Sequence, residues 1–316
     1  MRDRTGALLA LLLVGVVSAC AGPAVSPGGS GVATAPASPT APASPTPPAT
    51  AAPSPVVSIP AGPTSDPATW PLAWSDEFDG PAGTPPDGRS WLFDLGGSGW
   101  GNNERQFYTS DTANAALDGK GSLLVTVLAN DGSLACHYGP CDYTSARLLT
   151  RGRYEFQYGR VEARIRVPAG FGLWPAFWML GANVGEVSWP KSGEIDIMEF
   201  VGRRPTEVLG TIHGPGYSGS SGITKSVDLG KPVGDEFHVF AMEWLPSRIT
   251  WFLDGVQYHE ARPADVAPNA WVFDHPFFLL LNVAVGGNLG GPVPPGLTFD
   301  QPMAVDYVRV YQENAP

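Results

Sequence analysis

Every aromatic side chain of this 316-residue chain lies at or after Trp70. The preceding stretch, from Ala21 to Ala68, contains 13 prolines and a single charged residue, Asp66. Because such a stretch buries too little apolar surface to offset the entropy of ordering it, we expect it not to fold. The foldable part is therefore residues 69–316, enough for one large all-β domain but not for two globular domains of ordinary size.

The net charge belongs to this same part of the chain. The first 69 residues hold two basic and two acidic side chains, so the net charge of −11 falls on the remainder. An acidic domain without a run of Lys or Arg suits neither nucleic acid nor an anionic membrane surface. The charge favours a neutral or cationic partner, or serves solubility alone.

Residues 1–19 have the layout of a secretory signal. Two arginines lie within Met1–Thr5, and Ala7–Val17 is an apolar run too short to remain as a membrane-spanning helix. The run ends in VSAC, which resembles the lipobox of bacterial lipoproteins and implies cleavage before Cys20 and acylation of its sulfur. The alternative is ordinary secretion, with Cys20 in the discarded peptide. We therefore expect an exported protein, either a cell-membrane lipoprotein facing outward or secreted, with residues 20–68 forming an extended Pro/Ala/Ser/Thr linker.

Two further cysteines, Cys136 and Cys141, remain in the foldable part. Export places them in an oxidising compartment, where an even pair predicts a disulfide. A C-x₄-C pair without a second His/Cys cluster is a weak metal signal, so we favour the disulfide.

Short segments of alternating apolar and polar residues recur through residues 69–316. Apolar residues at 161, 163, 165 and 167 interleave with charged ones, a period of two that predicts a half-buried strand. Strands are likewise predicted at 122–129, 153–158, 238–244 and 304–311. Asp254-Gly255 predicts a tight hairpin between 249–253 and 256–260. Since no amphipathic helix is evident, the pattern favours an antiparallel sandwich or jelly roll over a barrel of alternating strands and helices.

Three carboxylates interleave with apolar residues in the segment EIDIME, residues 194–199. On a strand, Glu194 and Asp196 share one face, whereas strict alternation places Glu199 on the other. A β-bulge at Ile197–Met198 absorbs the extra residue and returns Glu199 to the acidic face. Two glutamates so placed can bring their carboxyls to about 5–5.5 Å, as in a retaining glycosidase, with pKa values driven apart. The pattern alone leaves two other interpretations open, a solvated acidic face and a Ca²⁺ site.

In its context this segment resembles the signature of glycoside hydrolase family 16, in particular its laminarinase-like (endo-β-1,3-glucanase) branch. The extra Met198 is typical of that branch and is missing from the lichenase-like one. The resemblance extends over nearly the whole foldable part, through SDEFDG (75–80), GWGNNERQFYT (99–109), residues 144–181, GTIHGPG (210–216) and VDYVRVYQ (305–312). It implies an all-β fold, a concanavalin-like β-jelly-roll sandwich with a concave substrate cleft.

The resemblance also implies roles for individual residues. Glu194 matches the nucleophile, Glu199 the general acid/base, and Asp196 the residue that hydrogen-bonds and tunes the nucleophile. The positions that match glycan subsites are Asn103, Arg147, Trp174, Trp178, Trp189 and His213. Trp244 and Trp251, by contrast, are expected in the core.

No cofactor for catalysis is implied, but one structural Ca²⁺ is. Asp306 matches its carboxylate ligand, and Glu77 and Gly121 match the backbone carbonyl donors. The implied activity is retaining, endo-acting hydrolysis of β-1,3-glucosidic linkages in laminarin-like β-glucans, by a monomer. The alternatives are a β-1,3-1,4-glucanase or galactanase of the same family, or a noncatalytic β-glucan-binding protein. The presence of all three acids argues against the last.

Overall fold

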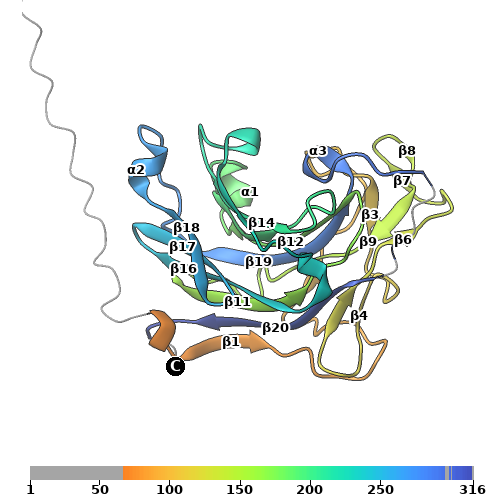
Figure 1. Ribbon diagram of the computed structural model, residues 1–316, viewed down its shortest axis with the longest axis horizontal. Coiled ribbons are helices and arrows are strands. Elements are labelled where there is room, and N and C mark those ends of the chain that lie inside the picture. Colours follow the sequence, from red (N-terminus) through yellow and green to blue (C-terminus); the bar gives the residue numbers. More distant parts are fainter. Residues whose placement is uncertain (1–66, 296–298, 300, 315–316) are drawn as a thin grey trace, which may run out of the picture. The chain divides into compact units, whose positions relative to one another are not determined.

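The computed structural model describes residues 67–295, 299 and 301–314; the predicted signal, Cys20 and the linker up to residue 66 lie outside them. Helix in the described part is confined to six short turns. These are α1 (Val184–Val187), α2 (Pro263–Val266), α3 (Gly287–Gly290) and the 3₁₀ turns η1 (Pro67–Thr69), η2 (Gly219–Ser221) and η3 (Val233–Asp235). None of the described helices is long and apolar enough to cross a membrane. The all-β prediction is confirmed (Figure 1).

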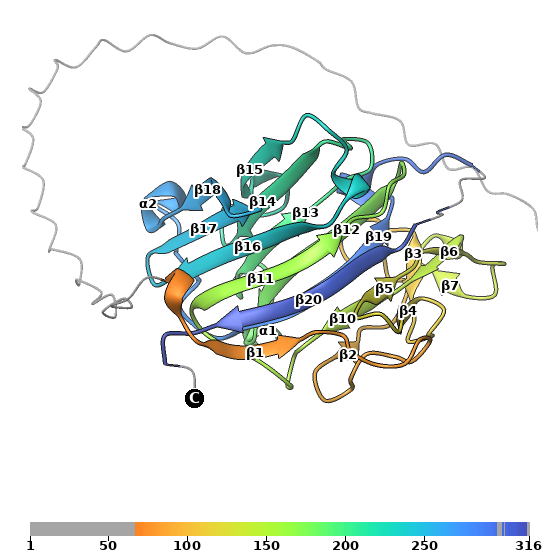
Figure 2. The same cartoon turned by 60° about the horizontal axis from the view of Figure 1, so that its bottom comes forward.

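One layer of the sandwich is an eight-stranded antiparallel sheet in the order β18-β17-β16-β11-β20-β5-β4, with β1 also paired to β20 (Figure 2). Its strands are β1 (Leu72–Asp76), β4 (Ala115–Leu117), β5 (Leu123–Val125), β11 (Gly159–Arg166), β16 (His238–Leu245), β17 (Arg248–Leu253), β18 (Val256–Ala261) and β20 (Met303–Tyr311). Burial alternates strictly along β11, as the period of two predicts. One face of this sheet therefore lies in the core and the other in solvent.

The second layer is a seven-stranded sheet in the order β15-β14-β13-β12-β19-β10-β2. Its strands are β2 (Leu92–Phe93), β10 (Arg147–Leu149), β12 (Leu173–Gly181), β13 (Glu194–Glu199), β14 (Glu207–His213), β15 (Ile223–Asp228) and β19 (Phe277–Val285). We call the side turned away from the eight-stranded sheet its outer face. Figure 1 shows the loops that carry α1, α2 and α3 rising around this face, so the predicted jelly-roll sandwich has one concave side.

Short strands complete the fold beside these layers. They are β3 (Gln106–Tyr108), β6 (Leu128–Ala129) and β9 (Tyr143–Ser145) in one small sheet and β7 (Ala135–Cys136) and β8 (Gly139–Pro140) in a hairpin. The core between the two large sheets contains Trp244 and Trp251, both fully buried as expected.

The predicted strands at 238–244 and 304–311 are confirmed as β16 and β20, and the hairpin as β17–β18. Asp254 and Gly255 have φ of 50° and 80°, the left-handed pair that a type I′ turn requires. The strand predicted at 122–129 is instead two strands, β5 and β6, which belong to different sheets.

The strand predicted at 153–158 is wrong. This segment turns back on Thr150, whose carbonyl accepts from the backbone N–H groups of Arg153 and Tyr154. It makes only one isolated bridge in the described structure, between Phe156 and Phe277. The rings of Tyr154 and Phe156 stack on one another with their centres 5.4 Å apart. The alternating aromatic residues therefore form a local cluster and do not indicate a strand.

Candidate active site

The predicted β-bulge in β13 is confirmed by its register with both neighbours. On one side, Asp196 lies opposite Trp178 and Met198 opposite Phe177, so Ile197 has no partner. On the other side, Asp196 lies opposite Thr211 and Glu199 lies opposite Leu209. From one pair to the next, β13 therefore advances by three residues while β14 advances by two. Ile197 and Met198 are both buried in the core between the sheets. The bulge therefore takes two successive apolar residues inward and restores Glu199 to the face of Asp196.

The three acids lie on the outer face of the seven-stranded sheet. Directly opposite residues share a face, and Glu194 lies opposite Leu180, which belongs to a small cluster separate from the inter-sheet core. Asp196 and Glu199 are buried, whereas the side chain of Glu194 keeps 19% of its exposure. The interpretation of a solvated acidic face is therefore wrong, because two of its three carboxylates are withdrawn from water.

A histidine and a tryptophan lie against these carboxylates. His213, opposite Glu194 on β14, places Nε2 3.2 Å from Oδ2 of Asp196 and 3.8 Å from Oε1 of Glu194. Trp174 donates its Nε1–H to Oε1 of Glu199 at 3.0 Å. Within the described residues, Glu194, Asp196 and His213 are the one group of three side chains close enough to share a metal ion. Its imidazole is unlike the all-oxygen shell of Ca²⁺, which argues against the Ca²⁺ interpretation of this face.

The electrostatics of the site follow from burial. Desolvation is the largest cause that raises the pKa of Glu194, Asp196 and Glu199, each to about 8. The charge of Asp196 further raises the pKa of both glutamates, and His213 opposes this rise. The pKa values are thus raised together, and the prediction that they are driven apart is wrong for the site without substrate, because burial acts on all three acids alike. The site therefore retains protons near neutral pH, the condition for a carboxyl that donates one to a leaving group.

The tryptophans and the arginine predicted as subsite residues surround the acids. Trp178 lies opposite Asp196, and its Nε1 donates to Oδ1 of Asn282 at 2.8 Å. The guanidinium of Arg147 is 4.9 Å from the ring centre of Trp178 and 4.6 Å from that of Trp100. Trp189, 45% exposed, has its ring 6.3 Å from that of His213.

Asn103, the remaining predicted subsite residue, contacts α3 through its side chain. It lies exposed on a loop, with φ of 57°, and its Nδ2 donates to Oδ1 of Asn288 in α3 at 2.9 Å. Its position is thus tied to α3 rather than to β13.

A buried polar network behind Trp178 was missed at the level of sequence. Asn282 Nδ2 donates to the hydroxyl of Tyr108 at 3.1 Å, and that hydroxyl donates to Oε2 of Glu104 at 3.1 Å. Glu104 is buried and also accepts from Nε2 of Gln106 at 2.6 Å. Two signals could have revealed the network: Asn282 is the one polar residue of FFLLLNVAV, and Glu104, Gln106 and Tyr108 alternate with a period of two.

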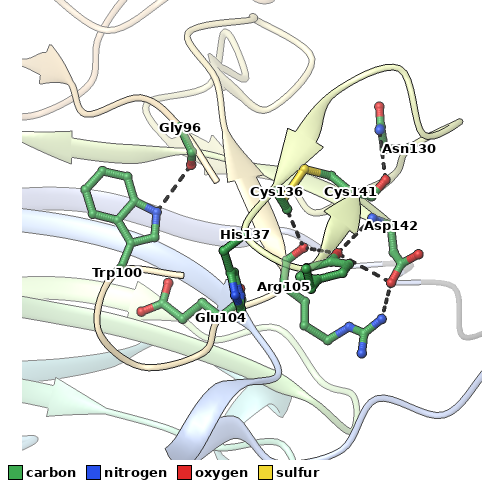
Figure 3. Close-up of a disulfide and its surroundings, with 10 residues drawn as sticks. Gly96, Trp100, Glu104, Arg105, Asn130, Cys136, His137, Cys141 and Asp142 are labelled. Atoms are coloured by element: carbon green, nitrogen blue, oxygen red, sulfur yellow. Dashed lines mark hydrogen bonds and ion pairs between the residues drawn. A yellow bond between two sulfur atoms is a disulfide. The ribbon is translucent and has the colours of Figure 1, made fainter. Parts of the chain in front are cut away.

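Cys136 and Cys141 form a disulfide in the described structure, in the hairpin β7–β8. The hairpin lies against the segment that carries Glu104 and Arg105 (Figure 3). His137 Nε2 lies 3.1 Å from the carbonyl of Glu104, and Tyr138 donates its hydroxyl to the carbonyl of Arg105 at 2.7 Å.

The residues expected to bind Ca²⁺ converge on β20. The register between β11 and β20 shifts at Asp306, which has no partner residue on β11. Along its other edge, β20 pairs first with β5 and then with β1. Glu77 directly follows β1, and Gly121 lies two residues before β5. The Asp306 carboxylate is paired with Arg164 at 2.7 Å, and the side chain of Glu77 is paired with Arg309.

The fold is a jelly roll, and its bulged strand carries three clustered acids that tryptophans surround. This combination is that of a glycoside hydrolase. The family model of glycosyl hydrolases family 16 matches residues 102–298, and the chain belongs to this family. It is 43% identical over 255 residues to a beta-glucanase of Rhodothermus marinus, an alignment that covers 77% of this chain and 85% of that protein.

Two solved structures are similar to this one. The laminarinase catalytic domain of Thermotoga maritima matches with a TM-score of 0.72 and 42% identity, covering 78% of this chain and 99% of that one. The endo-beta-1,3-glucanase of Pyrococcus furiosus matches with a TM-score of 0.70 and 42% identity, covering 78% and 96%.

Proposed function

We propose that this protein is a retaining endo-β-1,3-glucanase that acts on laminarin-like glucans. The observation that carries the proposal is the bulged strand Glu194–Glu199, which places three acids on one face in a chain of family 16. The laminarinase and the endo-beta-1,3-glucanase that it resembles support the choice of linkage.

The buried carboxyls supply the two roles of a retaining mechanism. Glu194, the most exposed of the three, attacks the anomeric carbon as the carboxylate, the form that His213 and Trp189 favour, and forms a glycosyl-enzyme. Glu199, whose raised pKa keeps it protonated near neutral pH, gives its proton to the leaving oxygen and then takes one from the attacking water. Asp196, beside Glu194 and His213, holds the nucleophile and tunes its ionisation.

The aromatic side chains around the acids suit a glucan. The indole rings of Trp174, Trp178 and Trp189 offer apolar faces to the C–H faces of glucose units. His213, Arg147 and Asn103 offer polar groups to the hydroxyls. This combination of apolar surface and a few placed polar groups is typical of sites for neutral ligands.

Product analysis on laminarin, curdlan, lichenan and agarose tests the proposal. We expect oligosaccharides of several lengths from laminarin and curdlan, with the β-anomer as the first product in NMR spectra. Preferential cleavage of lichenan or agarose would contradict the linkage, a first product of inverted anomeric configuration would contradict the mechanism, and binding without reducing-end release would contradict catalysis.

A structural Ca²⁺ at Asp306 is the second part of the proposal. The ends of β1 and β5 meet β20 there, which suits the donation of two backbone carbonyls from Glu77 and Gly121. The pair between Asp306 and Arg164 is half-exposed, and such surface pairs stabilise by about 0–1 kcal/mol, so a divalent cation can compete with the guanidinium.

We further propose that the chain is exported and anchored through Cys20, on the grounds of the apolar run and VSAC. We also propose that it acts as a monomer. Cys20→Ala should release activity from membranes to the medium or leave an unprocessed precursor. Unchanged processing and fractionation would contradict lipidation, and a dimer in light scattering would contradict the monomer.

A further inference from the structure

The carbonyl of Asp196 has an unusual partner. The register shift at Ile197–Met198 interrupts the ladder between β13 and β14 directly after Asp196. A bulge leaves backbone groups without their usual ladder partners, and buried carbonyls need a donor. Here the donor comes from the opposite sheet, because Trp251 on β17 directs its Nε1–H to the Asp196 carbonyl at 2.8 Å.

Gly210 makes this contact possible. It lies on β14 between Leu209 and Thr211, the two residues that pair on either side of the bulge. A Cβ on Gly210 would lie 2.7 Å from Cδ1 and 2.9 Å from Nε1 of Trp251, and 2.6 Å from the hydroxyl of Tyr258. The missing side chain therefore leaves the opening through which the indole reaches the strand that carries the acids.

The indole itself is held firmly. Trp251 is fully buried, and its ring stacks on that of His259 at 4.4 Å with 22° between the planes. A rigid donor fixed in one sheet thus anchors the bulge in the other. If the bulge relaxed to a regular ladder, the alternation of faces would turn Glu199 toward the core.

We propose that Trp251 is a positioning residue for the reaction: its hydrogen bond to the Asp196 carbonyl maintains the bulge that presents Glu199 as the general acid. The inference rests on the proposed function, since it concerns the acid of that mechanism. It also distinguishes Trp251 from Trp244, whose indole N–H donates to Phe273 and not to the strand of the acids.

Trp244 supplies a matched control. It is also fully buried, lies on the neighbouring strand β16, and donates its Nε1–H to a backbone carbonyl, that of Phe273, at 3.0 Å. Trp251→Phe and Trp244→Phe therefore each remove one indole N–H from a buried carbonyl and leave a similar void. Only the first removes a hydrogen bond to the strand of the acids.

The measurement is kcat/KM for two substrates, a laminari-oligosaccharide and 2,4-dinitrophenyl β-laminaribioside. The second needs no acid for departure of its leaving group, so misplacement of Glu199 should slow it far less. For Trp251→Phe we expect the loss on the oligosaccharide to exceed the loss on the aryl glycoside by about 10-fold or more, a part of what a general acid supplies. For Trp244→Phe the two losses should be equal.

Equal losses on both substrates for Trp251→Phe would overturn the inference while leaving the proposed function intact. A wild type that hydrolyses neither substrate would overturn the proposed function, and the inference with it. If Trp251→Phe does not melt cooperatively, Gly210→Ala replaces it, because the new methyl group displaces the indole without removing it. An unchanged ratio of the two losses in that variant would also overturn the inference.

Discussion

His213 Nε2 lies 3.2 Å from Oδ2 of Asp196, and the ring stands directly opposite Glu194 on the neighbouring strand. Asp196 is thus placed between a glutamate and an imidazole, while its own burial raises its pKa to about 8. A carboxyl that keeps its proton near neutral pH can donate a hydrogen bond to Glu194 and stabilise the nucleophile in its charged form.

Asp196→Asn should therefore move the basic limb of the pH profile of kcat/KM toward acid. Once Asp196 ionises, above about pH 8, its charge raises the pKa of Glu194 and of Glu199. Asparagine never acquires that charge, so both glutamates should lose their protons at lower pH than in the wild type. Because the asparagine amide can still donate to Glu194, the loss of activity should be smaller than for either glutamate. A basic limb that stays in place, or moves toward higher pH, would contradict this role.

The same cluster should make the protein less stable as the pH rises. A carboxyl whose pKa is raised on folding stabilises the fold while it is protonated in both states, and this contribution is lost as the pH climbs from about 4 toward 8. Glu199→Gln should therefore raise Tm above that of the wild type at pH 8 but not at pH 4. Each kcal/mol regained corresponds to about 2–4 °C for a domain of this size, which calorimetry at the two pH values can measure. An exposed acid such as Glu186 gives the control, since Glu186→Gln should change Tm little at either pH.

The acidic strand β13 and the strands β11, β16 and β20 could be predicted because their information is local. The strands β12, β14 and β19 could not, because most of their residues are buried and their sequences show no regular alternation. Alternation in β11 and the turn at Asp254-Gly255 depend on neighbouring residues, and the bulge at Ile197–Met198 follows from counting faces between Glu194 and Glu199. Trp251 could be assigned to the core from its strand pattern. Its hydrogen bond to Asp196 could not be predicted, because it joins two sheets and depends on the gap at Gly210.

The segment 153–158 and the network through Glu104 show the same limit. Alternating aromatic residues indicate a strand, but the hydrogen bonds from Arg153 and Tyr154 to Thr150 close a turn instead. Glu104 looks like a surface acid in the sequence, but in the structure it is buried and accepts from Gln106 and Tyr108. The Tyr108 hydroxyl is held in turn by distant Asn282, which the sequence does not place beside it.

Glu194→Ala and Glu199→Ala should each abolish most turnover, and azide should rescue them differently. With an activated aryl β-glycoside, azide enters Glu194→Ala from the vacated nucleophile face and gives the α-glycosyl azide. In Glu199→Ala the glycosyl-enzyme still forms on Glu194, so azide gives the β-glycosyl azide. NMR of the products distinguishes the two. The same anomer from both variants would contradict the assignment of roles, and unchanged binding of laminarin would show that the fold survives.

Loss of the disulfide should affect the loop of Asn103 more than the fold. Cys136 and Cys141 are five residues apart, so the bridge should stabilise by less than the roughly 3 kcal/mol expected for a 15-residue loop. The hairpin contacts the carbonyls of Glu104 and Arg105, so Cys136→Ser with Cys141→Ser should raise KM for laminarin while kcat changes little. A lowered kcat with KM unchanged would show that the hairpin acts on the chemical step instead.

Calcium should stabilise the wild type through Asp306, and Arg164 should oppose it. Ca²⁺ at millimolar concentration should raise Tm relative to EDTA, because a ligand that binds only the folded state shifts unfolding by mass action. Asp306→Asn should abolish this difference by removing the one carboxylate ligand. Arg164→Gln should enlarge it, since the guanidinium 2.7 Å from that carboxylate no longer competes with the cation.

Glu77→Gln, which alters a side chain paired with Arg309 but leaves the backbone carbonyl, should keep the response to Ca²⁺. A wild type whose Tm is the same in Ca²⁺ and EDTA would contradict the site, and a response that persists in Asp306→Asn would place the ion elsewhere.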